Sequence, residues 1–184
     1  LYIRPHNRRR ARDAADDKLK TKKRLIRYGV PTPELLTVFT SLRDVRAFDW
    51  ATITGGFVLK PARGYGGGGI MVVGKWDGAK GRSAGVDVTM QELEAEIFSI
   101  LDGAYSLDNL PDVAFLEERV VVSSAMRKLA KKGVPDIRII VMHGVPVMAM
   151  LRLPTEASNG KANLHQGALG LGIDLRTGIT TKAV

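Results

Sequence analysis

The segment 57–73 (FVLKPARGYGGGGIMVV) constrains the fold most strongly, because a glycine-rich loop joins two short apolar runs. Runs rich in β-branched residues on both sides of such a loop predict an antiparallel hairpin with a long tip. Glycine adopts positive φ angles easily and lets backbone N–H groups approach a ligand, so this tip suits phosphate oxygens. Lys60 ends the first run, where its ammonium can meet the same phosphates. Two interpretations follow, a nucleotide triphosphate held under a flexible flap or a mobile tip without a ligand.

The better-known phosphate loops do not fit this segment. A Walker loop needs Gly-Lys-Ser/Thr at the start of a helix, whereas Gly69 is followed by the strand-like run Ile-Met-Val-Val. A dinucleotide fingerprint also requires a helix at this point. The spacing of Gly64, Gly66 and Gly69 is closer to a kinase glycine loop, but no His-Arg-Asp or Asp-Phe-Gly follows anywhere in the chain.

The chain has 184 residues, of which 45% are hydrophobic and 26% charged, and it contains no cysteine. This length predicts one domain, or two small lobes that share a cleft. No apolar run approaches the roughly 20 residues of a membrane span, and no signal peptide opens the sequence. The lack of cysteine excludes disulfides and thiolate metal sites and agrees with a cytoplasmic location. Because the sequence lacks an initiator Met and stops after a strand-like segment, we expect it to be a fragment.

Positive charge is concentrated at the N-terminus, where residues 1–30 hold eleven Lys and Arg against three Asp, in a chain with net charge +9. Such a segment can bind nucleic acid through phosphate contacts. The alternative is a solvated helix face preceded by an arm, and we favour it because no aromatic residues are interleaved for base stacking.

Periodicity and turn residues predict alternating helices and hairpins. The expected helices cover residues 18–28, 42–50 and 89–101; the expected strands cover residues 35–39, 113–122, 136–141, 145–153, 169–175 and 179 onward, besides the glycine hairpin; residues 1–12 are expected to be an extended arm, and residues 74–88 and 154–167 loops. Thr89 and Glu92 stand in the positions of a capping box. The alternation favours an α+β fold with antiparallel sheets.

Two of these elements carry specific expectations. Asp16 and Asp17 can cap the first helix, whose apolar face we assign to Leu19, Leu25 and Ile26. The strand 113–122 contains the consecutive charges Glu117, Glu118 and Arg119. Charges inside a strand are costly to bury, so we expect a ligand or solvent to satisfy them.

Six segments resemble motifs of the ATP-grasp fold and follow one another in the order found in that fold. Within the fold, they resemble the RimK-related, alpha-L-glutamate-ligase-like group of carboxylate–amine ligases. They are DDKLKTKKRL (16–25), GVPTPEL (29–35), the glycine hairpin, AFLEERV (114–120), PDIRIIVMHGVPVMAMLRLP (135–154) and GKANLHQGA (160–168). The resemblance implies two α+β lobes with antiparallel sheets that grip ATP between them, the C-terminal part of the fold lying beyond this chain. It divides the chain into a basic arm (1–15), an N-terminal lobe with the glycine flap (16–113) and an incomplete C-terminal lobe (114–184).

The resemblance also assigns roles to individual residues. It implies that Lys18 and Lys60 are the two phosphate lysines, that Gly66, Gly67 and Gly68 form the flap, and that Glu117, Glu118, Arg119 and Val120 form the hinge that binds adenine. It further implies that Asp136 binds the ribose hydroxyls and that Arg152, Lys161 and Asn163 line the triphosphate and the acyl phosphate, with Arg152 and Asn163 catalytic. These residue types suit the roles chemically. Cationic side chains attract phosphate, and carboxylates accept hydrogen bonds from hydroxyl groups.

The implied reaction is ATP-dependent ligation of a carboxylate and an amine through an acyl phosphate, with Mg²⁺ and with an amino acid or peptide, glutamate among them, as substrate. The family's magnesium ligands lie beyond Val184, and Glu156 and Asn159 lack their spacing, so we assign no metal ligand here. His6 and His143 are not expected to form a metal cluster, and His165 either touches substrate or caps its loop. The alternatives are a nucleic-acid-binding module and a catalytically silent ATP-grasp relative. No membrane partner is expected, and the sequence does not predict the oligomeric state.

Overall fold

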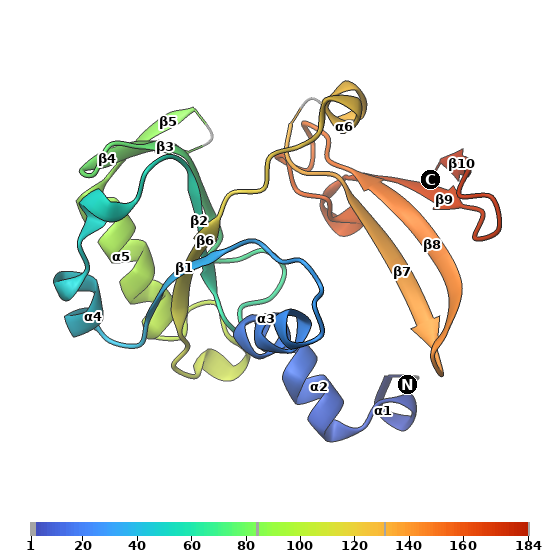
Figure 1. Cartoon of the computed structure of the whole chain (residues 1–184), viewed down its shortest axis with the longest axis horizontal. Coiled ribbons are helices and arrows are strands. Elements are labelled where there is room, and N and C mark those ends of the chain that lie inside the picture. Colours follow the sequence, from blue (N-terminus) through green and yellow to red (C-terminus); the bar gives the residue numbers. More distant parts are fainter. Residues whose placement is uncertain (1–2, 84, 131, 184) are drawn as a thin grey trace. The chain divides into compact units, whose positions relative to one another are not determined.

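The computed structural model describes residues 3–83, 85–130 and 132–183. The chain divides into two compact units, one formed by residues 7–119 and the other by residues 1–6 together with 120–184. Each unit contains one sheet in which all pairs of neighbouring strands are antiparallel (Figure 1). The predicted α+β class with antiparallel sheets is therefore confirmed.

The first unit is built on a six-stranded sheet with the order β1-β6-β2-β3-β4-β5. Its strands are β1 (Leu35–Phe39), β2 (Phe57–Pro61), β3 (Met71–Trp76), β4 (Lys80–Ser83), β5 (Val86–Thr89) and β6 (Ala114–Glu118). Its α-helices are α2 (Arg9–Ala15), α3 (Lys18–Arg27), α4 (Leu42–Ala47) and α5 (Met90–Leu101), and 3₁₀ turns cover Trp50–Thr52 and Leu107–Asn109. The expected boundary between residues 113 and 114 stays a prediction, although β6 pairs with β1 and β2 in this sheet.

Local signals in the sequence place several of these elements correctly. The glycine hairpin is β2 and β3, whose register pairs Phe57 with Val73. The capping box is present at the start of α5, where Thr89 and Glu92 each accept from the other's backbone N–H. The side chain of Asp17 caps α3 by accepting from the N–H of Lys20 at 3.0 Å.

Three expectations about secondary structure are wrong. The segment 1–12 is not an extended arm but contains α1 (Ile3–His6) and most of α2, whose arginines and alanines are good helix formers. The segment 74–88 is not a loop but contains the end of β3 and the strands β4 and β5; β4 (KGRS) is polar, whereas β5 (VDVT) alternates and buries Val88. The strand expected over residues 113–122 ends at Glu118, and α6 (Ser124–Leu129) follows it without having been predicted.

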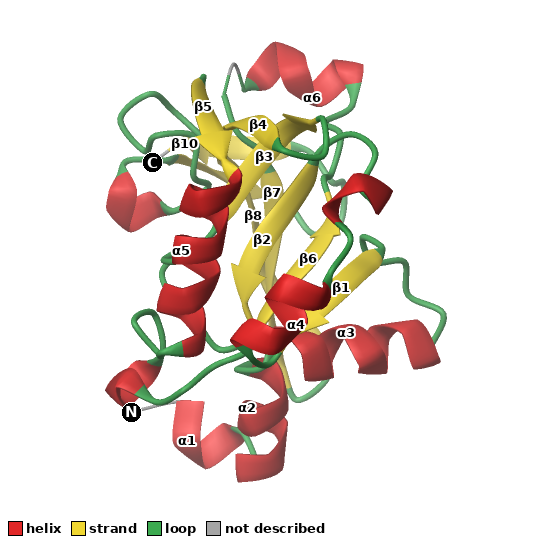
Figure 2. Ribbon diagram, turned by 90° about the vertical axis from the view of Figure 1, so that its left-hand side faces the viewer, coloured by secondary structure: helices red, strands yellow, loops and turns green. Residues whose placement is uncertain are grey.

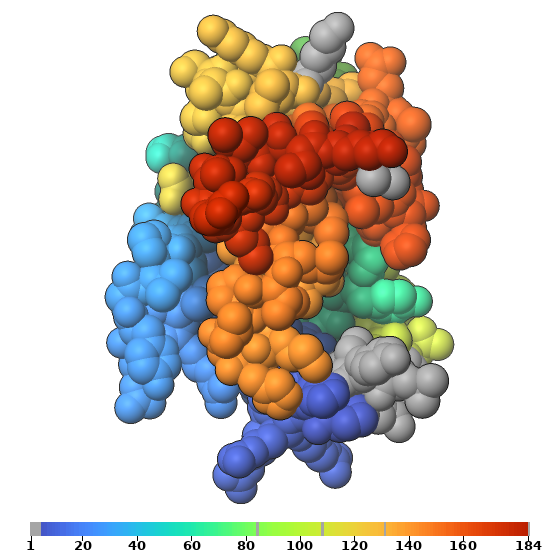
Figure 3. Space-filling view, turned by 90° about the vertical axis from the view of Figure 1, so that its right-hand side faces the viewer, coloured from blue at the N-terminus to red at the C-terminus, as the bar shows by residue number. Residues whose placement is uncertain are grey.

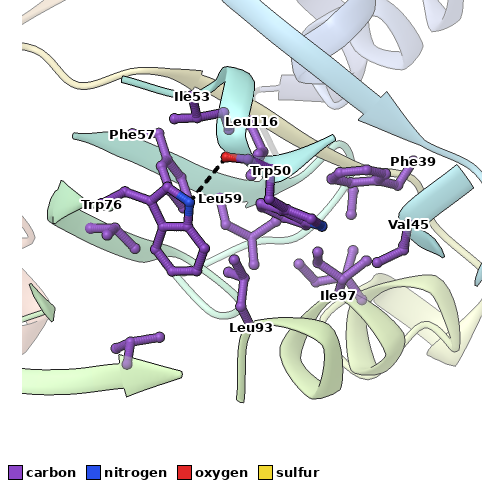
Figure 4. Close-up of a cluster of buried hydrophobic side chains, with 14 residues drawn as sticks. Phe39, Val45, Trp50, Ile53, Phe57, Leu59, Trp76, Leu93, Ile97 and Leu116 are labelled. Atoms are coloured by element: carbon purple, nitrogen blue, oxygen red, sulfur yellow. Dashed lines mark hydrogen bonds between the residues drawn. The ribbon is translucent and has the colours of Figure 1, made fainter. Parts of the chain in front are cut away.

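The hydrophobic core lies between one face of the six-stranded sheet and the helices α4 and α5 (Figure 2). Trp50, Phe57 and Trp76 lie close together in it, and the indole N–H of Trp76 donates to the carbonyl of Trp50 at 3.3 Å (Figure 4). From α5, Leu93 and Ile97 are fully buried against these rings. Burying large apolar side chains in this way fixes the sheet that presents the candidate site.

The second unit contains a four-stranded sheet with the order β10-β9-β8-β7. Its strands are β7 (Asp136–Met142), β8 (Val145–Leu153), β9 (Leu169–Ile173) and β10 (Thr180–Ala183), and a 3₁₀ turn covers Leu164–Gln166. The predicted hairpin about His143 and Gly144 is confirmed, and both turn residues have positive φ, 50° and 83°. Many aliphatic side chains of β7 and the first half of β8 are exposed, and they contribute to the orange surface in Figure 3.

Candidate functional site

Helix α3 presents two lysines rather than an apolar face toward the sheet. Lys18 and Lys22 lie one turn apart on the same side of the helix, and Lys22 is buried, with an exposed fraction of 6%. The apolar face expected for this helix is wrong at Ile26, which is 58% exposed, and Leu19 and Leu25 are only partly buried. A lysine that points inward needs partners, and the neighbouring strands supply them.

Lys18 ties the start of α3 to the segment that leads into the glycine loop. Its ammonium donates to the carbonyl of Gly64 at 2.6 Å, and its backbone N–H donates to the carbonyl of Ala62 at 2.9 Å. Burial lowers the pKa of Lys18, the positive charge of Lys60 lowers it further, and the carboxylates of Asp112 and Asp17 act in the opposite direction. The two predicted phosphate lysines are therefore close enough to repel each other.

Lys60 and Lys22 share one buried carboxylate, that of Glu117, which is 5% exposed. Lys60 pairs with Oε1, and Lys22 pairs with Oε2 at 3.0 Å. The ammonium of Lys22 also donates to the carbonyl of Pro33. We expected a ligand or solvent to satisfy the charge in this strand, and at Glu117 that expectation is wrong, because lysines of the protein itself do so.

The chain that leaves β2 is also held by a buried carboxylate, Asp112. Its Oδ2 accepts from the backbone N–H of Arg63 and its Oδ1 from that of Val113, both at 2.8 Å. The guanidinium of Arg63 lies 3.8 Å from the carboxylate of Asp17. Sequence analysis missed Lys22, Asp112 and Arg63, and a charged residue on the inward side of an otherwise amphipathic helix is the signal that could have found Lys22.

The tip of the glycine loop forms a turn that lies against an aromatic ring. Gly66, Gly67 and Gly69 have positive φ, and the N–H of Gly68 donates to the carbonyl of Tyr65 at 3.1 Å. A Cβ atom at Gly69 would lie 2.5 Å from the ring of Tyr105, so glycine is required there for two independent reasons. The tip therefore has a backbone that adopts positive φ angles and that packs against the ring of Tyr105.

The backbone of the predicted adenine hinge is partly engaged in the sheet. Glu117 stands opposite Val58 in β2 and Leu35 in β1, and the N–H of Glu118 donates to the carbonyl of Glu34 at 2.8 Å. The strand ends there, and Arg119 and Val120 follow it. Arg119 and Val120 are thus the hinge residues that lie beyond the strand, and the adenine-binding role of residues 117–120 stays a prediction.

The remaining predicted residues lie in the second unit. Asp136 and Arg152 face each other across β7 and β8 and form a two-point ion pair, with Nε–Oδ1 at 2.7 Å and Nη2–Oδ2 at 2.6 Å. This hydrogen bonding raises the pKa of Arg152. Asn163 accepts from the N–H of His165 at 3.1 Å and so caps a 3₁₀ turn, while Lys161 is exposed. The grouping of these residues with Lys18, Lys60 and Glu117 about one cleft stays a prediction.

Within the part of the chain that the structure describes, no group of three or more histidine, aspartate or glutamate side chains could hold a metal ion. A magnesium site is therefore not assigned to these residues, and the expected Mg²⁺ stays a prediction. Among the described helices, none combines the length and apolar character needed to cross a membrane.

Comparison with known families gives one match over residues 1–184, to a family described as sugar-transfer associated ATP-grasp. No curated protein matches the chain. The family match agrees with the predicted ATP-grasp fold and indicates ATP-dependent, ligase-type chemistry. The finer likeness to RimK-related glutamate ligases stays a prediction.

Proposed function

The chain belongs to the sugar-transfer associated ATP-grasp family, and on that basis we propose that it is an ATP-dependent ligase that joins a carboxylate to an amine. The observation that carries the proposal is the contact between Lys18 and Gly64, with Lys60 nearby. It brings two ammonium groups to the entrance of a glycine loop. Such an arrangement suits a triphosphate, because ammonium groups and the backbone N–H groups of glycine-rich loops are its natural partners.

In the proposed reaction, an oxygen of the substrate carboxylate attacks the terminal phosphorus of ATP, and ADP leaves. The amine then attacks the carbonyl carbon of the acyl phosphate, and the products are an amide and inorganic phosphate. Lys18 and Lys60 would hold the phosphates and offset the charge that develops on them, which is the main contribution a protein makes to phosphoryl transfer. Mg²⁺ would supply further charge compensation when bound.

The other predicted residues take part in the same proposal. Gly66, Gly67 and Gly68 would cover the phosphates, Arg119 and Val120 would read adenine, and Asp136 would bind the ribose. Arg152 and Asn163 would act on the acyl phosphate, together with Lys161. Asp136 and Arg152 form an ion pair with each other. For Asp136 to bind the ribose and Arg152 the acyl phosphate, this ion pair must open or the two side chains must bind the ligand together. A cytoplasmic location is also part of the proposal.

The test is ATP-dependent release of phosphate by the protein with Mg²⁺ and paired panels of acids and amines. Because the family is described as sugar-transfer associated, we add sugar acids and amino sugars to the amino acids and short peptides of the panel. We expect one acid–amine pair to stimulate release of ADP and phosphate and to yield a new amide detectable by mass spectrometry.

The control is Lys60→Ala, which removes charge-assisted bonds to phosphate worth roughly 1.5–3 kcal/mol and should weaken ATP binding about ten- to hundredfold. The fold should persist, since Lys60 is partly exposed at the end of β2. ATP binding without turnover on any pair would favour a catalytically silent relative. Unchanged affinity in Lys60→Ala would contradict the assignment of the phosphate site.

A further inference from the structure

The buried lysine of α3, Lys22, lies behind the candidate phosphate site and was not singled out by its sequence. We propose that Lys22 is a positioning residue, which occupies one oxygen of the Glu117 carboxylate and so leaves the charge of Lys60 available to an anionic ligand. The inference rests on the proposed function for the identity of that anion. It assigns to Lys22 no contact with the ligand itself.

The register of the sheet explains why these three side chains meet. Glu117 stands opposite Val58, and Lys60 stands opposite Phe115, so Lys60 and Glu117 are diagonal neighbours on one face of β2 and β6. Lys22 reaches the same carboxylate from α3. The Lys22 side chain is 7% exposed and that of Lys60 is 27% exposed. Lys22 is therefore the inner ammonium, and Lys60 is the one that solvent or a ligand can reach.

The charges of these three groups do not cancel. Burying an ion is costly unless it is paired, and the Glu117 carboxylate provides one oxygen to each lysine. Two ammonium groups share one carboxylate, so one net positive charge remains, and the more accessible Lys60 can offer it. Without Lys22, the Glu117 carboxylate would have Lys60 as its one ammonium partner among the described residues and would neutralise its positive charge. The site would then lose its attraction for phosphate although Lys60 was still present.

A purely structural role for Lys22 makes a different prediction. Through Glu117 and the carbonyl of Pro33, Lys22 also ties α3 to the sheet and to the segment before β1. If this were its whole role, removing it would lower stability, and a second substitution at Glu117 would only add to the damage. The electrostatic role predicts that the second substitution restores the missing charge.

The experiment compares Lys22→Met, the double variant Lys22→Met/Glu117→Gln and a control, Lys23→Met, which removes the same charge from the exposed side of the same helix. Calorimetry measures the affinity of the full chain for ATP and for inorganic tripolyphosphate, each with Mg²⁺, and thermal melts record stability. We expect Lys22→Met to bind both ligands about tenfold more weakly. The double variant should return to within about threefold of the unmodified protein, and Lys23→Met to within about twofold.

Each other result overturns a specific statement. If Lys22→Met keeps the original affinity, or if the double variant binds as weakly as the single one, Lys22 does not position Lys60, while ATP binding by the unmodified protein leaves the proposed function intact. If the expected pattern is found with tripolyphosphate but the protein does not bind ATP, the role of Lys22 stands and the proposed function fails. Binding of neither ligand by the unmodified protein contradicts both.

Discussion

The ammonium of Lys18 donates a hydrogen bond of 2.6 Å to the carbonyl of Gly64, a residue 46 positions further along the chain. The first residue of α3 is thereby connected to the glycine loop that follows β2. A phosphate that binds Lys18 competes with the Gly64 carbonyl for the same ammonium protons. If Lys18 binds phosphate as proposed, ligand binding and the conformation of the loop would be coupled through this side chain.

Lys18→Met should loosen the glycine loop in the protein without ligand. The Gly64 carbonyl loses its donor, and glycines regain backbone freedom readily. Hydrogen exchange of residues 64–70 is expected to accelerate, while exchange in α5 stays unchanged. Lys23→Met serves as the matched control, because it removes an exposed lysine from the same helix. Identical exchange in the loop of both variants would contradict the coupling.

The lowered pKa of Lys18 predicts a pH dependence of stability. Burial disfavours the charged form, so the pKa in the folded state lies below the unfolded value of about 10.5. The unfolded state then binds more protons between these two pKa values, and the contribution of Lys18 to stability increases as the pH rises through that window. Urea unfolding of the unmodified protein and Lys18→Met from pH 7 to 10.5 measures this. The difference in stability should shift in favour of lysine as the pH rises; a difference that shifts the other way would show that the burial of Lys18 is not the dominant cause.

Glu117→Gln should destabilise the first unit strongly. The change leaves two ammonium groups near each other with no carboxylate between them, and breaking a buried ion pair typically costs about 3–5 kcal/mol. Chemical denaturation gives the cost, and Glu118→Gln, at an exposed neighbouring position, is the control. A cost below about 1 kcal/mol would mean that the carboxylate is hydrated in solution.

The ion pair of Asp136 and Arg152 should contribute much less. The Asp136 side chain is 42% exposed and that of Arg152 is 20% exposed, so solvent screens the attraction. A double-mutant cycle with Asp136→Asn and Arg152→Met is expected to give a coupling of about 0.5–1 kcal/mol in unfolding free energy. Coupling well above this range would indicate that the pair is part of a larger buried network.

Adenine should be preferred over guanine. Backbone at the end of β6 can offer a carbonyl to the exocyclic amine of adenine and an N–H to a ring nitrogen, whereas guanine presents its own carbonyl at the position of that amine. An unsatisfied buried polar group costs about 1–3 kcal/mol, so we expect at least about tenfold discrimination. Competition between ATP and GTP, with Mg²⁺ present, measures this. Equal affinities would remove the hinge assignment from Arg119 and Val120.

The sequence predicts those elements that short-range chemistry specifies. The tip of the β2–β3 hairpin is encoded by glycines, the start of α5 by Thr89 and Glu92, and the β7–β8 turn by His143 and Gly144. Each signal involves residues within a few positions of one another, so it survives without knowledge of the fold.

The rest depends on contacts between distant segments. Lys22 is buried because Glu117 and Pro33 receive its ammonium, and neither is near it in the sequence. Strands β4 and β5 have four residues each, and β4 (KGRS) has no large apolar side chain, so their place in the sheet depends on pairing with β3 and with each other rather than on a long local pattern. The family resemblance predicts phosphate roles for Lys18 and Lys60, but it does not indicate that Glu117 is paired with Lys60 and Lys22.

Strand β7 has a consequence for the behaviour of this protein in concentrated solution. It lies at one end of its sheet, and its exposed run Ile137–Met142 carries a single charged residue, Arg138. An exposed apolar strand at a sheet edge is a template for pairing with further copies, and a lone charge within it acts as a gatekeeper. We therefore expect Arg138 to oppose association of copies of the chain through the exposed edge of β7.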